Sequence, residues 1–168
     1  MPRKLSPAAE DRTPLTRLHE GSAHALVGYQ LAQAAIVTNQ VFDERVGHQR
    51  AGLRRVEFTI LALVQSNRDV TARQLARALA VTPPNIAIWL DKLEARGLVA
   101  RQRSTTDARV HHIRITPAGA TLVDSSVQQL LQGEEAALSS LTPAERAMMV
   151  ELLHKVALSR KRGEPKGG

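Results

Sequence analysis

The chain has 168 residues, of which 43% are hydrophobic and 23% are charged, a composition typical of one globular domain with its own core. Cysteine is absent, which excludes disulfides, thiolate metal sites, iron–sulfur clusters and catalytic cysteines. The first dozen residues contain no apolar signal segment, and no apolar run approaches the roughly 18 residues of a membrane-spanning helix. These features predict a soluble, cytoplasmic protein.

The positive charge of the chain is concentrated in its middle. The whole chain has 23 basic and 16 acidic residues, a net charge of +7, and residues 45–115 alone hold 13 of the basic and 5 of the acidic ones. This local excess predicts a polyanionic partner, although a basic solvated surface would carry the same charge. Only four aromatic residues occur, too few to stack the bases of a single strand, which favours duplex DNA.

The N-terminal part predicts an arm followed by a long helix. Residues 1–14 are rich in proline and charge and predict a flexible arm. Residues 15–45 have apolar residues near helical spacing and no internal proline, with a start signal at Gly21. Two glycines, Gly47 and Gly52, bracket a predicted loop.

The central segments predict two consecutive short helices after a longer one. A helix is expected over residues 56–66, and residues 71–74 form a capping box that opens the next helix. After a brief turn, Thr82 is expected to cap a further helix, with Pro83 at its first position and Gly97 just after its end.

The C-terminal half predicts a hairpin and two more helices. Residues 98–103 and 110–115 alternate in polarity and are separated by a polar, turn-prone stretch, as in a β-hairpin. One helix is expected after Thr116, weakened near Gly133, and another after the capping box of residues 142–145. The predicted fold is therefore mostly α with a small β-hairpin wing, a winged helix-turn-helix with long flanking helices.

The helix that begins at Thr82 predicts a DNA-reading face. Its buried stripe of Ile86, Leu90 and Leu93 leaves small and polar residues on the other side. Hydroxyl and amide groups can bond base edges or phosphates, and alanine and isoleucine can meet a thymine methyl. The predicted DNA contacts of this helix are Thr82, Pro83, Pro84, Asn85, Ala87, Ile88 and Lys92. A plain core helix would show the same stripe.

The arginines of the hairpin favour the DNA-binding interpretation. Arg101 and Arg103 precede the tip and Arg109 follows it, and a flexible loop with arginine suits the negative potential of the minor groove. Asp107 is assigned a bracing role, because a carboxylate that did not orient a neighbouring arginine would repel phosphate. Arg73, on the preceding helix, is a further predicted DNA contact. A solvated hairpin with randomly placed charges is the alternative.

The run from Leu75 to Gly119 resembles the core of the MarR (multiple-antibiotic-resistance regulator) family, and the helix order is similar over roughly residues 22–160. The most specific pieces are Leu93-Glu94-Ala-Arg96-Gly97-Leu98-Val99 before Arg101, Asp107-Ala108-Arg109 at the tip, and Ile115-Thr116-Pro117-Ala118-Gly119. The family's tip usually reads Asp-Arg-Arg, so Ala108 removes one possible contact while Arg109 keeps the minor-groove role. The resemblance implies a homodimeric transcription regulator, usually a repressor released from DNA by a small ligand.

The terminal helices independently favour a dimer. Their apolar faces have no other domain to cover them, and an isologous two-fold interface is the usual solution. Two recognition helices would then lie about one DNA turn apart and read a pseudo-palindromic operator. The predicted parts are a flexible arm (1–14), a dimerisation and ligand helix (15–52), a winged helix-turn-helix DNA-binding domain (53–116), C-terminal dimerisation helices (117–160) and a basic tail (161–168).

The resemblance also implies an effector site where the first helix, the second helix and the DNA-binding lobe meet. The residues at matching positions are Arg55, Tyr29, Gln33, Ile36 and His24. A guanidinium beside an apolar crevice binds a carboxylate bidentately, and aromatic carboxylates are common ligands of the family, with a nicotinate-type acid as the narrower expectation. Alternatively, Arg55 contacts phosphate beside Arg54, and His24 is an ordinary surface histidine.

Three other functions remain as alternatives or are disfavoured. A metal-responsive regulator would need histidine and carboxylate ligands from distant segments, since His111 and His112 on one strand point to opposite faces. No phosphate loop, G-x-S-x-G or H-E-x-x-H motif occurs, so we expect neither enzymatic activity nor a cofactor. Winged helices also serve as protein–protein adaptors, which would show an exposed apolar patch in place of the polar face.

Overall fold

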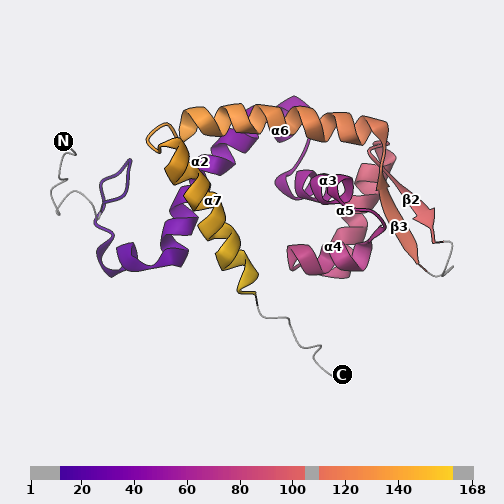
Figure 1. Ribbon diagram of the computed structural model, residues 1–168, viewed down its shortest axis with the longest axis horizontal. Coiled ribbons are helices and arrows are strands. Elements are labelled where there is room, and N and C mark those ends of the chain that lie inside the picture. Colours follow the sequence, from indigo (N-terminus) through magenta and orange to yellow (C-terminus); the bar gives the residue numbers. More distant parts are fainter. Residues whose placement is uncertain (1–11, 105–109, 161–168) are drawn as a thin grey trace, which may run out of the picture.

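The computed structural model describes residues 12–104 and 110–160, which form helices around one small sheet (Figure 1). The helical elements are η1 (Gly21–Ala25), α2 (Val27–Arg45), η2 (Gly47–Ala51), α3 (Arg55–Ser66), α4 (Ala72–Leu79), α5 (Pro83–Ala95), α6 (Pro117–Ala137) and α7 (Pro143–Leu158). The strands are β1 (Val70–Thr71), β2 (Val99–Arg103) and β3 (His111–Ile115). The predicted mostly α class with a hairpin wing is confirmed. None of the helices described is both long and apolar enough to cross a membrane.

Helix α6 runs along the molecule and joins two groups of elements (Figure 1). Helices α3, α4 and α5 and the sheet lie at one end of α6, and α2 and α7 lie towards the other. The predicted weakness near Gly133 is wrong, because α6 continues to Ala137. A Cβ at Gly133 would lie 2.6 Å from Cγ1 of Val41 and 3.1 Å from Cγ of Arg45. The glycine therefore lets α2 pack closely against α6.

The predicted helix over residues 15–45 begins later than expected. Arg12 and His19 form an isolated antiparallel bridge, and the hydroxyl of Thr13 accepts a hydrogen bond from the Leu18 amide at 3.0 Å. These local hydrogen bonds satisfy the backbone without a helix. The extended residue Leu26 (ψ 117°) then separates the 3₁₀ turn η1 from α2. The long α-helix therefore begins only at Val27.

Three of the predicted threonine caps form as expected. The Thr71 hydroxyl accepts from the Gln74 amide at 3.2 Å, and the Thr116 hydroxyl accepts from the Gly119 amide at 3.0 Å. At the start of α7, the Thr142 backbone amide and hydroxyl both donate to the Glu145 carboxylate, at 2.7 and 2.8 Å. These two hydrogen bonds lower the pKa of Glu145. Side-chain capping thus fixes where α4, α6 and α7 begin.

The sheet has three antiparallel strands in the order β1-β3-β2. The hairpin of β2 and β3 is called the wing here, and both of its strands match the prediction. Val70 of β1 and Arg101 of β2 flank Ile113 of β3 from opposite sides. Strand β1 was not predicted, because two residues are too few to show alternation. The sheet ties the wing to the start of the helix-turn-helix.

The core lies within the lobe formed by α3, α4, α5 and the sheet. Ile60, Leu61, Leu75, Ile86 and Leu90 are at most 1% exposed and belong to one cluster of buried residues. Helix α7, by contrast, contributes no buried residue. The lobe is therefore a packed platform that holds α5, whereas α7 is largely uncovered.

Candidate nucleic-acid interface

Helix α5 has one buried and one exposed face, as its sequence predicts. Ile86, Leu90 and Leu93 are at most 1% exposed, and Trp89 packs at the edge of the core. All seven residues of this helix that are predicted to contact DNA are exposed: Thr82, Pro83, Pro84, Asn85, Ala87, Ile88 and Lys92. The polar face and the N-terminus of α5 are thus presented to solvent in the way that a recognition helix requires.

Thr82 occupies the N-cap position of α5, but its hydroxyl does not cap the helix. The predicted side-chain cap is wrong here, because Pro84 has no amide hydrogen at the second helical position, which is one of the two positions that a capping hydroxyl accepts from. The next amide, that of Asn85, donates instead to the Thr82 carbonyl at 3.1 Å. The Thr82 hydroxyl makes no hydrogen bond with any residue that the structure describes, which leaves it available to a base or phosphate.

The wing lies beside α5 and carries the two predicted strand arginines. Arg103 ends β2 opposite His111, and the ladder closes with a 2.9 Å hydrogen bond from the Ser104 amide to the Val110 carbonyl. Arg101 forms ion pairs with two carboxylates of α5. The predicted minor-groove residue Arg109 and its bracing partner Asp107 lie outside the described residues.

Two arginines lie one turn apart on α4. Arg73, a predicted DNA contact, and Arg77 are both exposed, and neither guanidinium is hydrogen-bonded or ion-paired with another residue in the described segments. Arg77 was not predicted, although its spacing of four residues from Arg73 places the two side chains on one face. The first helix of a helix-turn-helix crosses the DNA backbone, so both are suitable phosphate contacts.

Exposed large apolar residues are unevenly distributed. In residues 12–104 and 110–160 there are fifteen, and fourteen of them lie in the N-terminal segment, α2, α6 or α7. The exception is Ile88 on α5, which is 52% exposed. The helix-turn-helix surface therefore lacks the apolar patch expected of an adaptor, whereas the terminal helices expose a large one.

The structure does not bring the five predicted effector residues together. Tyr29 and His24 meet at Glu20, at 3.3 and 2.6 Å. Partial burial and the neighbouring Glu20 carboxylate raise the pKa of Tyr29. Gln33 and Ile36 follow along α2, where Gln33 is partly buried and Ile36 is 50% exposed.

Arg55 lies near the other end of α2. Its guanidinium pairs with the Asp43 carboxylate at 2.5 Å, donates to the Asn39 carbonyl at 3.4 Å and lies 5.8 Å from the centre of the Phe42 ring. Position 43 is fourteen residues from Tyr29, about 21 Å along a helix. One small ligand cannot contact both ends of this set.

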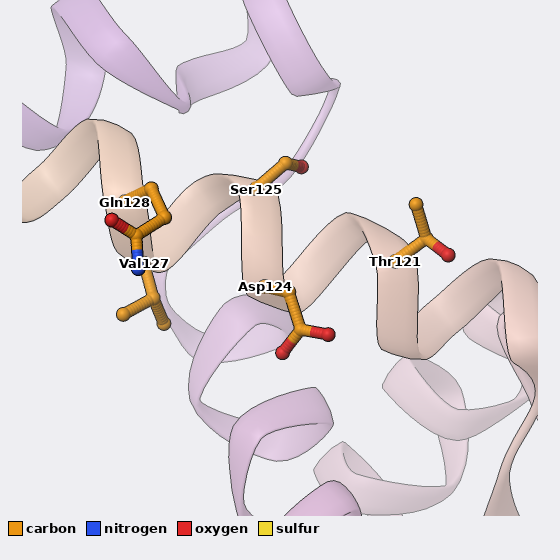
Figure 2. Close-up of a pocket in the computed structure, with 5 residues that line it drawn as sticks. All are labelled: Thr121, Asp124, Ser125, Val127 and Gln128. Atoms are coloured by element: carbon orange, nitrogen blue, oxygen red, sulfur yellow. The ribbon is translucent and has the colours of Figure 1, made fainter.

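None of the five predicted effector residues is among the residues that line the two cavities described next. A hollow of about 470 Å³ is lined by five residues that all come from α6, Thr121, Asp124, Ser125, Val127 and Gln128, whose side chains are drawn in Figure 2. Asp124 there accepts a hydrogen bond from Gln65 of α3 at 2.8 Å. A polar cavity of about 600 Å³ lies beside the Arg55 pair and is lined by Asp43, Glu44, Arg45, Gln49, Arg50 and Gln129. Arg45 and Arg50 give this polar cavity the guanidinium groups that bind a carboxylate.

The histidines that the structure describes do not form a metal site. Within the part of the chain that the structure describes, no three such side chains are placed to hold a metal ion. His112, on β3, lies with Nδ1 3.0 Å from the Asp69 carbonyl, and His111 is exposed.

Comparison with known proteins agrees with the winged helix-turn-helix. The MarR family model matches residues 53–111. The HTH-type transcriptional regulator MhqR of Bacillus subtilis is 30% identical over 110 residues, which cover 66% of this chain and 76% of MhqR. The chain belongs to the MarR family. As a MarR-family protein it is a DNA-binding transcriptional regulator.

Solved structures show the same architecture for this MarR-family protein. The transcriptional repressor CouR, bound to a 23-mer DNA duplex, is 28% identical and has a TM-score of 0.73, with 83% of this chain and 98% of that one covered. BpsR of Bordetella bronchiseptica, solved to explain how 6-hydroxynicotinic acid regulates its DNA binding, is 24% identical with a TM-score of 0.70, covering 81% and 96%. At that identity, the likeness to BpsR shows the fold alone.

Proposed function

We propose that this MarR-family regulator is a homodimeric repressor that binds a pseudo-palindromic operator and is released by a small aromatic carboxylate. The observation that carries the proposal is the exposed polar face of α5 beside the wing. Thr82 and Asn85 offer hydrogen-bonding groups there, and Ile88 offers an apolar contact for a thymine methyl. The similarity to the DNA-bound repressor CouR supports repression as the mode of regulation.

The terminal helices support the homodimer. An apolar groove of about 310 Å³ between α2 and α7 is lined mainly by Val27, Leu31, Met148, Met149, Leu152, Leu153 and Val156, with Glu145 at its edge. Leu152 and Val156 remain 51% and 50% exposed in the single chain. A second copy related by a two-fold axis would cover these faces and set two α5 helices on successive major grooves.

The effector fits better at the end of α2 near Arg55 than at the end near Tyr29 and His24. Arg45 and Arg50 line the polar cavity there, and no residue in the described segments pairs with either of them. A carboxylate entering the cavity could be held by these arginines and would compete with Asp43 for Arg55. Since 6-hydroxynicotinic acid regulates DNA binding by BpsR, which has the same fold, aromatic acids, including the nicotinate type, are the first class to test.

DNA binding is tested with the full-length protein and duplexes from the regions flanking its own gene. We expect one fragment to bind specifically in fluorescence anisotropy, with two half-sites in a footprint and an affinity that falls steeply as salt rises. A random duplex of equal length is the control. Equal affinity for every fragment at low and high salt would contradict operator recognition.

The effector is tested on the same complex. A panel of benzoate, 4-hydroxybenzoate and 6-hydroxynicotinate is added, with succinate as the aliphatic control. We expect one aromatic acid to release the operator from wild-type protein but to lose at least tenfold in potency on Arg55→Ala. His24→Ala, in η1 beyond the N-terminal end of α2, is the matched control and should respond normally. Release unaffected by Arg55→Ala would place the effector elsewhere.

A further inference from the structure

Helix α5 carries two carboxylates close to the surface proposed to face DNA. Asp91 and Glu94 are three residues apart, so they are neighbours on the helix surface. Their side chains are 63% and 38% exposed. Two acidic groups near a DNA-facing surface repel phosphate, so their presence needs a structural reason.

Arg101 of the wing contacts both carboxylates at once. Its Nη2 lies 2.5 Å from Oδ1 of Asp91, and its Nη1 lies 2.8 Å from Oε2 of Glu94. The backbone amide of Arg101 also donates to Oε1 of Glu94 at 3.2 Å. Three hydrogen bonds therefore join one residue of β2 to two residues of α5. Asp91, Glu94 and Arg101 are called the Arg101 cluster below.

The register of the sheet explains why Arg101 reaches α5. Arg101 lies directly opposite Ile113, and Val99 lies opposite Ile115. Cross-strand partners project to the same face of a sheet. Because Val99 and Ile113 are each only 2% exposed, Arg101 leaves β2 on the side that faces the core and α5. Its side chain is 34% exposed, so the guanidinium is half-sheltered between strand and helix.

The charges of the cluster argue against a phosphate contact by Arg101. An arginine that binds phosphate needs free guanidinium N–H groups directed outward. Here two of the guanidinium nitrogens are directed at Asp91 and Glu94, and the three side chains together carry a net charge of −1. Isolated surface ion pairs contribute little, but a forked pair with two carboxylates on a neighbouring element fixes an angle between elements.

We propose that Asp91, Glu94 and Arg101 are positioning residues that set the angle of the wing against α5, so that the recognition helix and the wing engage one operator half-site together. Arg101 acts through this contact and does not bind DNA itself. The proposal rests on the proposed function, because it requires that α5 and the wing contact the same operator.

The direction in which operator affinity changes on removal of the carboxylates distinguishes this positioning role from simple repulsion of phosphate. Removing a negative charge beside DNA strengthens binding if the carboxylates only repel phosphate. If they position the wing, the double variant Asp91→Asn/Glu94→Gln binds the operator more weakly, by about 3- to 10-fold, a typical coupling within a charged network. Its affinity for a random duplex should stay equal or rise, because non-specific binding depends on charge alone.

Two arginine variants test the same point from the wing. Arg101→Lys keeps the charge but cannot reach two carboxylates in the same forked geometry, so we expect it to lose operator affinity like Arg101→Ala. The logarithmic salt slope of both should match wild type. Arg73→Ala, which removes an exposed α4 arginine, is the matched control and should lower the slope by about one. Far-UV circular dichroism and thermal unfolding of each variant confirm that the lobe is folded.

The outcomes are distinct. Operator binding by Asp91→Asn/Glu94→Gln as tight as wild type or tighter would overturn the proposal, and so would full rescue of Arg101→Ala by Arg101→Lys. A salt slope lowered by Arg101→Ala as much as by Arg73→Ala would assign Arg101 to phosphate instead. Failure of the wild-type protein to prefer any duplex over random DNA would overturn the proposed function and, with it, the positioning role.

Discussion

Asn85 is the side chain on α5 best suited to distinguish bases. An amide can both donate and accept on the major-groove edge of adenine, whereas a hydroxyl or lysine is less selective. Asn85 is exposed in the first turn, and its own backbone amide already donates to the carbonyl of Thr82. Its side chain is therefore positioned without being used by the fold.

We expect Asn85→Ala to relax base preference at one position in each half-site. The expected loss of discrimination is about 1–3 kcal/mol at that position, with random-duplex affinity unchanged. Competition binding with single-base operator variants measures it. Equal weakening of specific and random binding would make Asn85 a phosphate contact.

The residues of α5 could be predicted from the sequence because the buried stripe repeats with the helical period and fixes the opposite face. The partners of Arg101 could not, since an ion pair between strand and helix depends on their relative placement. Alternation from the buried Val99 was the available signal. The predicted effector residues are spread from η1 along α2 to the start of α3 for the same reason, because positions along the sequence do not indicate which neighbouring element closes a site.

At the level of elements, the helix caps were predicted well from the sequence, whereas the places where one helix packs across another were not. A threonine followed by a glutamine or glutamate three residues later specifies a helix start through local hydrogen bonds alone. Gly133 looked like a weak point in sequence but lies where α2 contacts α6. Only the three-dimensional crossing shows that the missing side chain is what allows the contact.

We expect Gly133→Ala to lower the free energy of unfolding by about 1–3 kcal/mol, because the new methyl group would overlap Val41. Gly28→Ala in α2 is the matched control, since its Cβ would meet no atom within 4 Å. It should raise stability by about 0.4–1 kcal/mol. Urea unfolding of both variants measures the difference, and a stabilised Gly133→Ala would contradict the close crossing.

For the whole molecule, most of the exposed large apolar side chains lie apart from the face proposed to contact DNA. The apolar residues gather on the terminal helices, and the polar recognition face lies on the lobe at the far end of α6 (Figure 1). The surface proposed for assembly and the surface proposed to face DNA therefore do not overlap, so that each can be altered separately.

We expect Leu152→Asp in α7 to convert the dimer into monomers and to weaken operator binding by roughly 100-fold or more, through loss of two-site binding. Ile88→Asp on α5 is the reciprocal control, which should abolish operator binding and leave the dimer intact. Sedimentation equilibrium and anisotropy distinguish them. A dimeric Leu152→Asp protein would show that α7 is not the interface.

The unbroken course of α6 through Gly133 gives the molecule a lever arm. Its 21 residues span about 31 Å as a rigid rod. The crossing with α2 lies at Gly133, about 24 Å along the helix from Pro117, so a tilt of about 10° there would swing the Pro117 end by about 4 Å. If α6 tilts as a unit, the place of this crossing along the helix sets how far the lobe would move for a given tilt, and a bulkier residue at position 133 would change the packing at the pivot.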